Sequence, residues 1–197
     1  MTRTCCQILM RTLLCTLIVG AGMLSGQAAR AEELAGRVID VPDSDTVVIQ
    51  FGTQQKIVRL SGVDAPEMPQ PFGGNARMAL VKWSAGRQAV VEVTRGERDN
   101  RLEGRVLVDG RDLARDLVDQ GLAWRLPPVD EAQASNYSRD LAAAERMARR
   151  RQRGLWSQSD PLPPWRWRQF EAEAQGVIES QLDLPYDVHG RYEPSGR

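Results

Sequence analysis

Two short alternating segments near the start of the chain constrain its fold more than any other feature. In the first, Val47, Ile49 and Phe51 fall on one face and polar residues on the other, which is typical of a half-buried β-strand. Residues 52–54 have the composition of a hairpin turn, and residues 55–61 have the pattern of the returning strand. The chain is therefore expected to be built on an antiparallel β-hairpin.

The remaining periodicity extends this hairpin into a mainly β fold. Further strands are expected at 34–41, 89–95 and 104–108, and helices at 75–85, 112–120 and 135–153. Five short strands with a helix after the third are typical of an OB-type barrel. The expectation is an α+β, mainly β chain: a five-stranded OB-fold barrel with three helices. Trp165 and Trp167 should fold back on the barrel, no firm element is expected beyond Phe170, and the last fifteen residues should be loosely ordered.

The first 31 residues differ in composition from the rest. A basic start at Arg3 and Arg11 is followed by an apolar run over 12–26, and Ala29 and Ala31 supply small residues two apart. This is the pattern of a secretory signal peptide cleaved after Ala31, with a retained anchor as the alternative. We expect a periplasmic or secreted protein without stable membrane association after cleavage. The expected domains are the signal at 1–31, an OB-fold domain at 32–156, and a partly disordered Pro/Trp-containing extension at 157–197.

Cleavage would also change the chemistry of the chain. All three cysteines lie at positions 5, 6 and 15, so the mature protein would have no disulfide and no thiol chemistry. The whole chain has 26 basic and 26 acidic residues, and loss of three arginines with the signal leaves a net charge of −3. A net-acidic protein does not attract nucleic acid through its overall field, so such contacts would need a local basic patch.

Acidic side chains gather at the ends of the two hairpin strands. Asp43 and Asp45 precede the first strand, Arg59 lies in the second, and Asp64 and Glu67 follow it. Carboxylates held together repel one another unless a cation lies among them, and calcium is a hard ion that prefers oxygen ligands. An arginine beside such an ion suits a phosphate group. The pattern indicates metal-assisted attack on a phosphodiester, although each half could also be a structural turn.

Several motifs together carry a family resemblance. They are Asp43-x-Asp45-Thr46, Arg59-Leu60-x-Gly62-Val63-Asp64-Ala65-Pro66-Glu67, Val108-Asp109-Gly110-Arg111-Asp112, Gly121-Leu122-Ala123-Trp124 and Gly154-Leu155-Trp156. As a set, from about Gly36 to Trp156, they resemble the staphylococcal nuclease (thermonuclease) family. The segment 163–167 is similar to a tail that some bacterial members carry.

The resemblance implies a hydrolase with an OB fold, namely a calcium-dependent nuclease or endonuclease that cleaves DNA and RNA and leaves 3′-phosphate ends. It implies calcium ligation by the Asp45 and Asp64 carboxylates and by the Ala65 carbonyl, with Asp43 behind them. It also implies that Glu67 orients or deprotonates the attacking water and that Arg59 is the first phosphate-binding arginine.

This chain departs from the family pattern at three places. One is Ser44, which replaces the usual glycine of the first loop and is small enough for the loop to survive. The second phosphate-binding arginine follows a Tyr-Gly pair in the family, and counting places it at Arg101, where Asp99 and Asn100 replace that pair. Arg105 is the competing assignment. The two nucleotide-binding tyrosines of the family are missing from residues 125–129, which implies altered nucleotide affinity or base preference.

Two other classes of protein fit part of the pattern. One is a non-catalytic OB-fold module that binds nucleic acid or protein, and the other is an envelope protein that uses calcium only for folding. The retained carboxylates and Arg59 favour the nuclease, with DNA and RNA as substrates and a monomer as the functional unit. Cleavage with calcium and with chelator would separate these classes.

Overall fold

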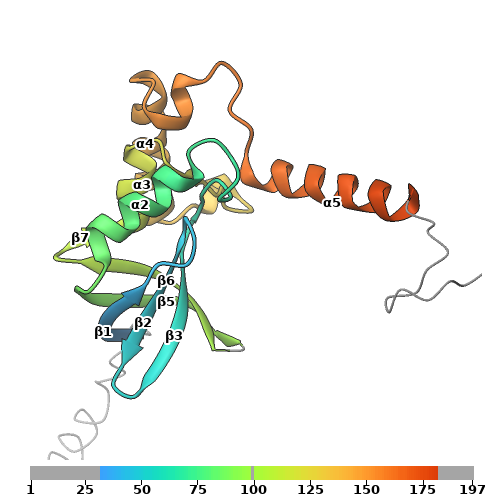
Figure 1. The fold of residues 1–197 in the computed structure, drawn as a ribbon. Helices are drawn as coiled ribbons and strands as arrows, with labels where there is room; N and C mark the ends of the chain where they lie inside the picture. The colour runs from blue at the N-terminus through green and yellow to red at the C-terminus, as the bar shows by residue number, and fades with distance from the viewer. Residues whose placement is uncertain (1–31, 99, 182–197) are drawn as a thin grey trace, which may run out of the picture. The chain divides into compact units, whose positions relative to one another are not determined.

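The computed structural model describes residues 32–98 and 100–181. The expected signal peptide, the lone histidine at position 189 and the loosely ordered C-terminus all lie outside these residues. Within these residues, five strands build the barrel: β1 (Glu33–Asp40), β2 (Thr46–Phe51), β3 (Gln54–Leu60), β5 (Gln88–Arg98) and β6 (Arg101–Val108). Figure 1 shows these strands crossing one another below the helices.

The five strands close on themselves. They follow the order β3-β2-β1-β5-β6 through antiparallel pairs, and a parallel pairing of β3 with β6 closes the ring. This confirms the expected five-stranded OB-type barrel. Short strands complete the fold: β4 (Val63–Asp64), β7 (Arg111–Asp112) and β8 (Trp124–Arg125).

In the part of the chain that the structure describes, four helices accompany the barrel, where three were expected. They are α2 (Gly73–Ser84), α3 (Leu113–Asp119), α4 (Asn136–Arg150) and α5 (Pro164–Gln181), with 3₁₀ turns η1 (Glu131–Gln133) and η2 (Gly154–Ser157). The expectation of no firm element beyond Phe170 is wrong, because α5 continues to Gln181. Residues 168–175 of α5 are exposed. An exposed helix does not need a stripe of apolar residues, so its sequence lacks the periodic pattern by which a helix is predicted.

The alternating pattern of the strands does bury one face. Val47 and Ile49 of β2 are fully buried, and in β6 the side chains at 102, 106 and 108 are buried with glycine at 104 between them. Helices α2, α3 and α4 contribute Leu80, Leu117 and Leu141 to the same core. The barrel and these three helices therefore form one hydrophobic core.

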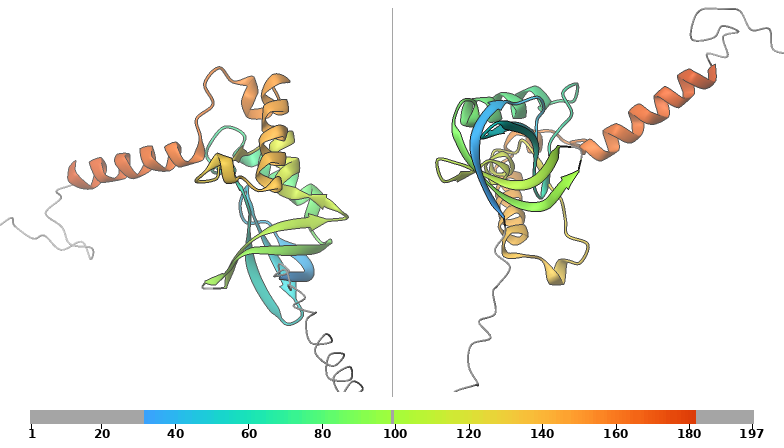
Figure 2. Two further views of the ribbon diagram at one scale, coloured as in Figure 1. Left: turned by 180° about the vertical axis from the view of Figure 1, so that it is seen from behind. Right: turned by 90° about the horizontal axis from the view of Figure 1, so that it is seen from below.

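A second, smaller apolar cluster joins the later part of the chain to the domain. Trp124 of β8 packs edge-on against Trp156 of η2, with ring centroids 5.3 Å apart. Trp165 in the first turn of α5 packs edge-on against the same Trp124 at 6.3 Å. The expectation that the tryptophan segment folds back is confirmed for Trp165. Figure 2 shows α5 leaving the domain from this end.

The described helices were also compared with the length and apolarity that a bilayer requires. None of the helices within residues 32–98 and 100–181 is both long and apolar enough to cross a membrane.

Candidate active site

An open pocket of about 1280 Å³ lies where the β1–β2 loop, β3, the segment after β4 and the β5–β6 hairpin meet. Every site residue expected from the sequence lines it: Asp43, Asp45, Arg59, Asp64, Ala65, Glu67 and Arg101. Residues separated by more than fifty positions along the chain thus face one space.

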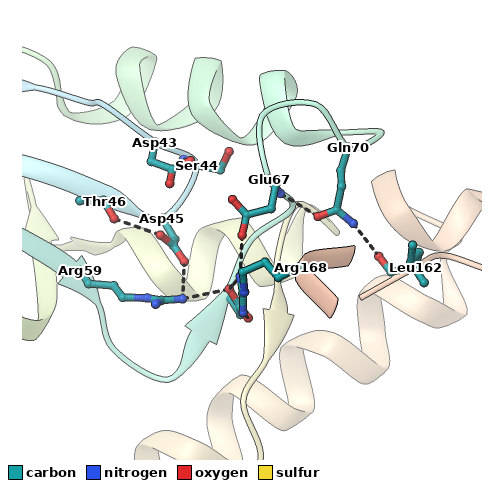
Figure 3. Close-up of polar contacts among 10 residues, drawn as sticks. Asp43, Ser44, Asp45, Thr46, Arg59, Glu67, Gln70, Leu162 and Arg168 are labelled. Atoms are coloured by element: carbon teal, nitrogen blue, oxygen red, sulfur yellow. Dashed lines mark hydrogen bonds and ion pairs between the residues drawn. The ribbon is translucent and has the colours of Figure 1, made fainter. Parts of the chain in front are cut away.

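Asp45 and Asp64 meet around one guanidinium group, and Figure 3 shows the contact of this group, that of Arg59, with Asp45. The Nη2 atom of Arg59 donates to Asp45 Oδ2 at 3.1 Å and to Asp64 Oδ1 at 2.9 Å. The two carboxylates are nearly buried, whereas 47% of the Arg59 side chain is exposed. One nitrogen of a charged guanidinium group therefore lies between two buried carboxylates at the edge of the pocket.

Strand pairing explains why these residues meet. Thr46 of β2 pairs with Arg59 of β3, and the Leu60 N–H donates to the Asp45 carbonyl at 2.9 Å. Asp64 is held by the pairing of β4 with β8, in which it lies opposite Trp124. The hairpin and this short second sheet thus set the positions of the carboxylates.

Burial dominates the electrostatics of Asp45. It raises the pKa of the Asp45 carboxyl, because the charged form loses hydration. The Arg59 guanidinium and the Thr46 hydroxyl oppose this rise, while the negative charges of Asp64 and Asp43 add to it. The pocket therefore favours a cation beside Asp45.

The Glu67 loop is fixed by short-range contacts. The Glu67 N–H donates to Gln70 Oε1 at 2.8 Å, and the Gly73 N–H donates to the Gln70 carbonyl at 3.0 Å. A Cβ at Gly73 would lie only 2.0 Å from the Glu67 carbonyl oxygen, so this close approach requires glycine. Ser44, which is buried, donates from Oγ to the Gly73 carbonyl at 3.0 Å. The loops that carry Asp45 and Glu67 are thereby joined.

A residue that the sequence analysis did not identify also enters the pocket. Arg168 of α5 donates from Nη2 to Asp64 Oδ2 at 2.8 Å and from Nη1 to Glu67 Oε1 at 2.5 Å. These hydrogen bonds, first that to Asp64, raise the pKa of the Arg168 guanidinium, which stays charged. The available signal was its place directly after Trp165-Arg166-Trp167, whose tryptophans were expected to fold back on the barrel.

The two candidates for the second arginine lie in different surroundings. Arg101, at the start of β6, is exposed in the pocket wall. Arg105 is not among the described residues that line this pocket. It binds Asp112 through Nε at 2.5 Å and packs over the Tyr137 ring at 5.2 Å. The geometry favours Arg101 as the residue that faces a ligand in the pocket.

The side-chain oxygens of the pocket supply only some of the ligands that a hard cation requires. Within the described residues, no group of three or more His, Cys, Asp or Glu side chains is gathered so as to hold a metal ion. Asp45 and Asp64 nevertheless bring oxygens within 3.1 and 2.9 Å of one cationic nitrogen, so both can face one ion. Calcium takes roughly six to eight oxygens. Water, a main-chain carbonyl and substrate oxygens would have to supply the remainder.

Comparison with known proteins agrees with the resemblance seen in the motifs. The family model described as "Staphylococcal nuclease homologue" matches residues 57–158. An "Uncharacterized endonuclease" of Escherichia coli O157:H7 is 34% identical over 139 residues, which cover 69% of this chain and 86% of that protein. "Protein ParB" of Escherichia coli is 32% identical over 145 residues, covering 69% and 80%.

A plant protein extends the same comparison to a larger relative. The "Staphylococcal-like nuclease CAN1" of Arabidopsis thaliana is 34% identical over 111 residues, which cover 56% of this chain and 32% of the plant protein. The family model spans half of the chain, and its match includes the later part of the second hairpin strand, the Asp64–Glu67 segment and the helices α2 to α4. On these matches, together with the barrel and the pocket, this chain belongs to the staphylococcal nuclease family.

Proposed function

We propose that this protein is a calcium-dependent nuclease that hydrolyses DNA and RNA and leaves 3′-phosphate ends. Nuclease activity itself follows from membership of the family. The metal, the range of substrates and the position of the cut are the parts that we propose. One observation carries the metal: the Asp45 and Asp64 carboxylates lie on the same nitrogen of Arg59 inside an open pocket. The range of substrates and the position of the cut are proposed from the resemblance to the family.

The carboxylates would hold the ion. Asp45 and Asp64, with the Ala65 carbonyl, would take calcium in place of the Arg59 contact, and Asp43 would add negative charge behind them. Bound there, calcium would polarise the phosphoryl group and offset charge on its oxygens. Released from the carboxylates, Arg59 would turn its guanidinium to the phosphate.

The remaining side chains support hydrolysis. Glu67 reaches the pocket from a fixed loop and is 26% exposed at its side chain, so it can contact water. It would accept the proton of that water as the new P–O bond forms and the bond to the 5′ oxygen breaks. The released 5′ oxygen takes a proton from water in the open pocket and becomes a hydroxyl, Glu67 returns its proton to solvent, and the phosphate stays on the 3′ side. Arg59 and Arg101 would stabilise the charge that grows on the phosphate oxygens.

We further propose that the protein acts in the periplasm or outside the cell. The apolar segment at 12–26 and the small residues before position 32 support this. Calcium reaches millimolar levels in such compartments, which suits a weak, open site.

End-labelled single-stranded DNA and RNA test the proposal. The purified protein should cleave both with calcium and neither with EGTA, and phosphatase should change the mobility of the products because they carry a 3′-phosphate. Glu67→Gln should fold, bind and cleave far more slowly. Cleavage that persists in EGTA would contradict the calcium requirement. Binding without cleavage under every condition would instead indicate the non-catalytic OB-fold module.

A further inference from the structure

We propose that Arg168 is a third phosphate-binding arginine of the active site, delivered by a helix that lies beyond the matched nuclease domain. The family model ends at residue 158, ten positions earlier. The inference deepens the proposed function and rests on it. Figure 3 shows Arg168 reaching Glu67 from α5, while Arg59 reaches Asp45 from β3.

The start of α5 is attached to the elements that carry the acidic residues. Gln70 donates from Nε2 to the Leu162 carbonyl at 3.1 Å, while its Oε1 accepts from the Glu67 N–H at 2.8 Å. One side chain therefore connects the Glu67 loop to the segment before α5. The position of the helix is coupled to the position of Glu67.

A second attachment sets the rotation of the helix. Trp165 packs edge-on against Trp124, the residue that pairs with Asp64 across β4 and β8. Residues three apart in a helix share a face, so this contact turns Arg168 toward Asp64. Arg166 lies on another face, where its guanidinium packs over the Phe170 ring at 5.5 Å. Only one of these two arginines is directed into the pocket.

The contacts of Arg168 suit exchange between a carboxylate and a phosphate. Its Nη2 and Nη1 lie 2.8 and 3.3 Å from the Asp64 oxygens, and Nη1 also reaches Glu67 at 2.5 Å. The side chain is 44% exposed, so it can move. When Asp64 binds a cation, Nη2 loses this partner while Nη1 keeps Glu67. A planar guanidinium can then bind a carboxylate with one nitrogen and a phosphate oxygen with the other.

A charge count supports the same exchange. Asp45, Asp64 and Glu67 carry three negative charges, against the two positive charges of Arg59 and Arg168. The other charged side chains that line the pocket cancel one another: Asp43, Glu103, Arg95 and Arg101. A divalent cation added to this cluster leaves one surplus positive charge. A phosphodiester, which carries one negative charge, would neutralise it. The cluster with both arginines and a metal is therefore matched to one backbone phosphate.

The test compares Arg168→Ala and Arg168→Lys with Arg166→Ala, a control that removes an arginine from the same helix outside the pocket. The first measurement is calorimetric binding of thymidine 3′-phosphate in the presence of calcium, a probe with a phosphate and no diester to cleave. Loss of one charge-assisted hydrogen bond should weaken binding about tenfold or more in Arg168→Ala. Arg168→Lys should be intermediate, and Arg166→Ala should match the wild type.

The second measurement is cleavage of single-stranded DNA, with melting temperature recorded for each variant. Arg168→Ala should lower kcat/KM by about ten- to a hundredfold while melting close to Arg166→Ala. Unchanged nucleotide affinity, or cleavage at or above the wild-type rate, would overturn the proposal and make Arg168 only an ion-pair partner of Asp64 and Glu67. Equal losses in both Arg168 variants accompanied by equal drops in melting temperature would also overturn it. If the wild type binds nucleotide and does not cleave, the proposed function fails and the binding data still decide the role of Arg168.

Discussion

Two clusters of arginine and carboxylate side chains can be compared in this domain: one faces the pocket, and the other stabilises the fold. The pocket cluster consists of Asp45, Arg59, Asp64, Glu67 and Arg168. The Arg105 cluster consists of Glu92, Arg105, Asp112 and Tyr137. The side chains of Asp64 and Asp112 are 4% and 5% exposed, so burial does not distinguish the clusters.

The two clusters differ in the hydrogen-bond donors that contact the buried carboxylate. Asp112 accepts from Arg105 with one oxygen and, with the other, from the Arg115 N–H at 3.0 Å, where it caps α3. Asp64 accepts from the guanidinium groups of Arg59 and Arg168. A carboxylate that caps a helix is committed to the fold. A carboxylate bound by flexible cationic side chains can exchange them for another cation.

The largest expected effect separates the two clusters by activity. Arg59→Ala should lower the cleavage rate about 10²–10³-fold, because a donor to the transition-state charge is lost, with little change in melting temperature. Arg105→Ala should instead cost about 2 kcal/mol of stability, or about 4–8 °C, and cleave normally once folded. Cleavage assays and thermal melts check both. A hundredfold loss of cleavage in a stable Arg105→Ala protein would reverse the assignment of the second arginine.

Calcium binding should affect only the pocket cluster. At a free calcium concentration of about a hundred times Kd, binding to the folded state should add about 2.7 kcal/mol, or about 5–10 °C of melting temperature. Asp45→Asn should abolish this increase, and Asp112→Asn should retain it from a lower starting temperature. Thermal melts in calcium and in EGTA measure the difference. An equal increase in Asp45→Asn would place the ion elsewhere.

The smallest effect concerns the Arg105 cluster at alkaline pH. Burial, followed by the nearby charge of Asp112, raises the pKa of Tyr137. The folded state therefore holds the phenol proton more tightly than the unfolded state does. Stability should be complete below the unfolded pKa of about 10 and fall above it, by at most about 1.4 kcal/mol per pH unit.

Tyr137→Phe isolates this contribution. Its hydroxyl donates to the Ser61 carbonyl at a long 3.4 Å, so the variant should lose little stability at pH 7 and depend less on pH above 10. Urea unfolding between pH 7 and 11 provides the comparison. Parallel pH curves for the two proteins would show that Tyr137 does not titrate differently in the fold.

Much of the pocket could be predicted because several of its residues lie close together along the chain. Asp45 and Arg59 lie fourteen residues apart on one hairpin, and the alternation of Val47 and Ile49 sets the pairing of that hairpin. The acids after β3 follow within a few residues. The short loops leave few alternatives for where these side chains can lie.

The choice between the two β6 arginines could not be made the same way. Arg101 and Arg105 are four residues apart, so alternation places both on the same face of the strand. Their neighbours differ: Arg101 pairs with Ile57 at the closing seam of the barrel, while Arg105 pairs with Glu92. Only closure of the barrel decides which one faces the pocket.

The barrel, the hairpin and the identity of the acidic residues could be predicted from the amino-acid sequence, because strand periodicity and short loops are local properties of the chain. In contrast, it takes the packed chain to show that α5 reaches the pocket and that Arg168, 104 residues from Asp64, binds the Asp64 carboxylate. That contact depends on one aromatic pair, Trp165 on Trp124, and on the Gln70 bridge. Contacts between a few distant side chains leave no periodic pattern, so they emerge only when the packed chain brings them together.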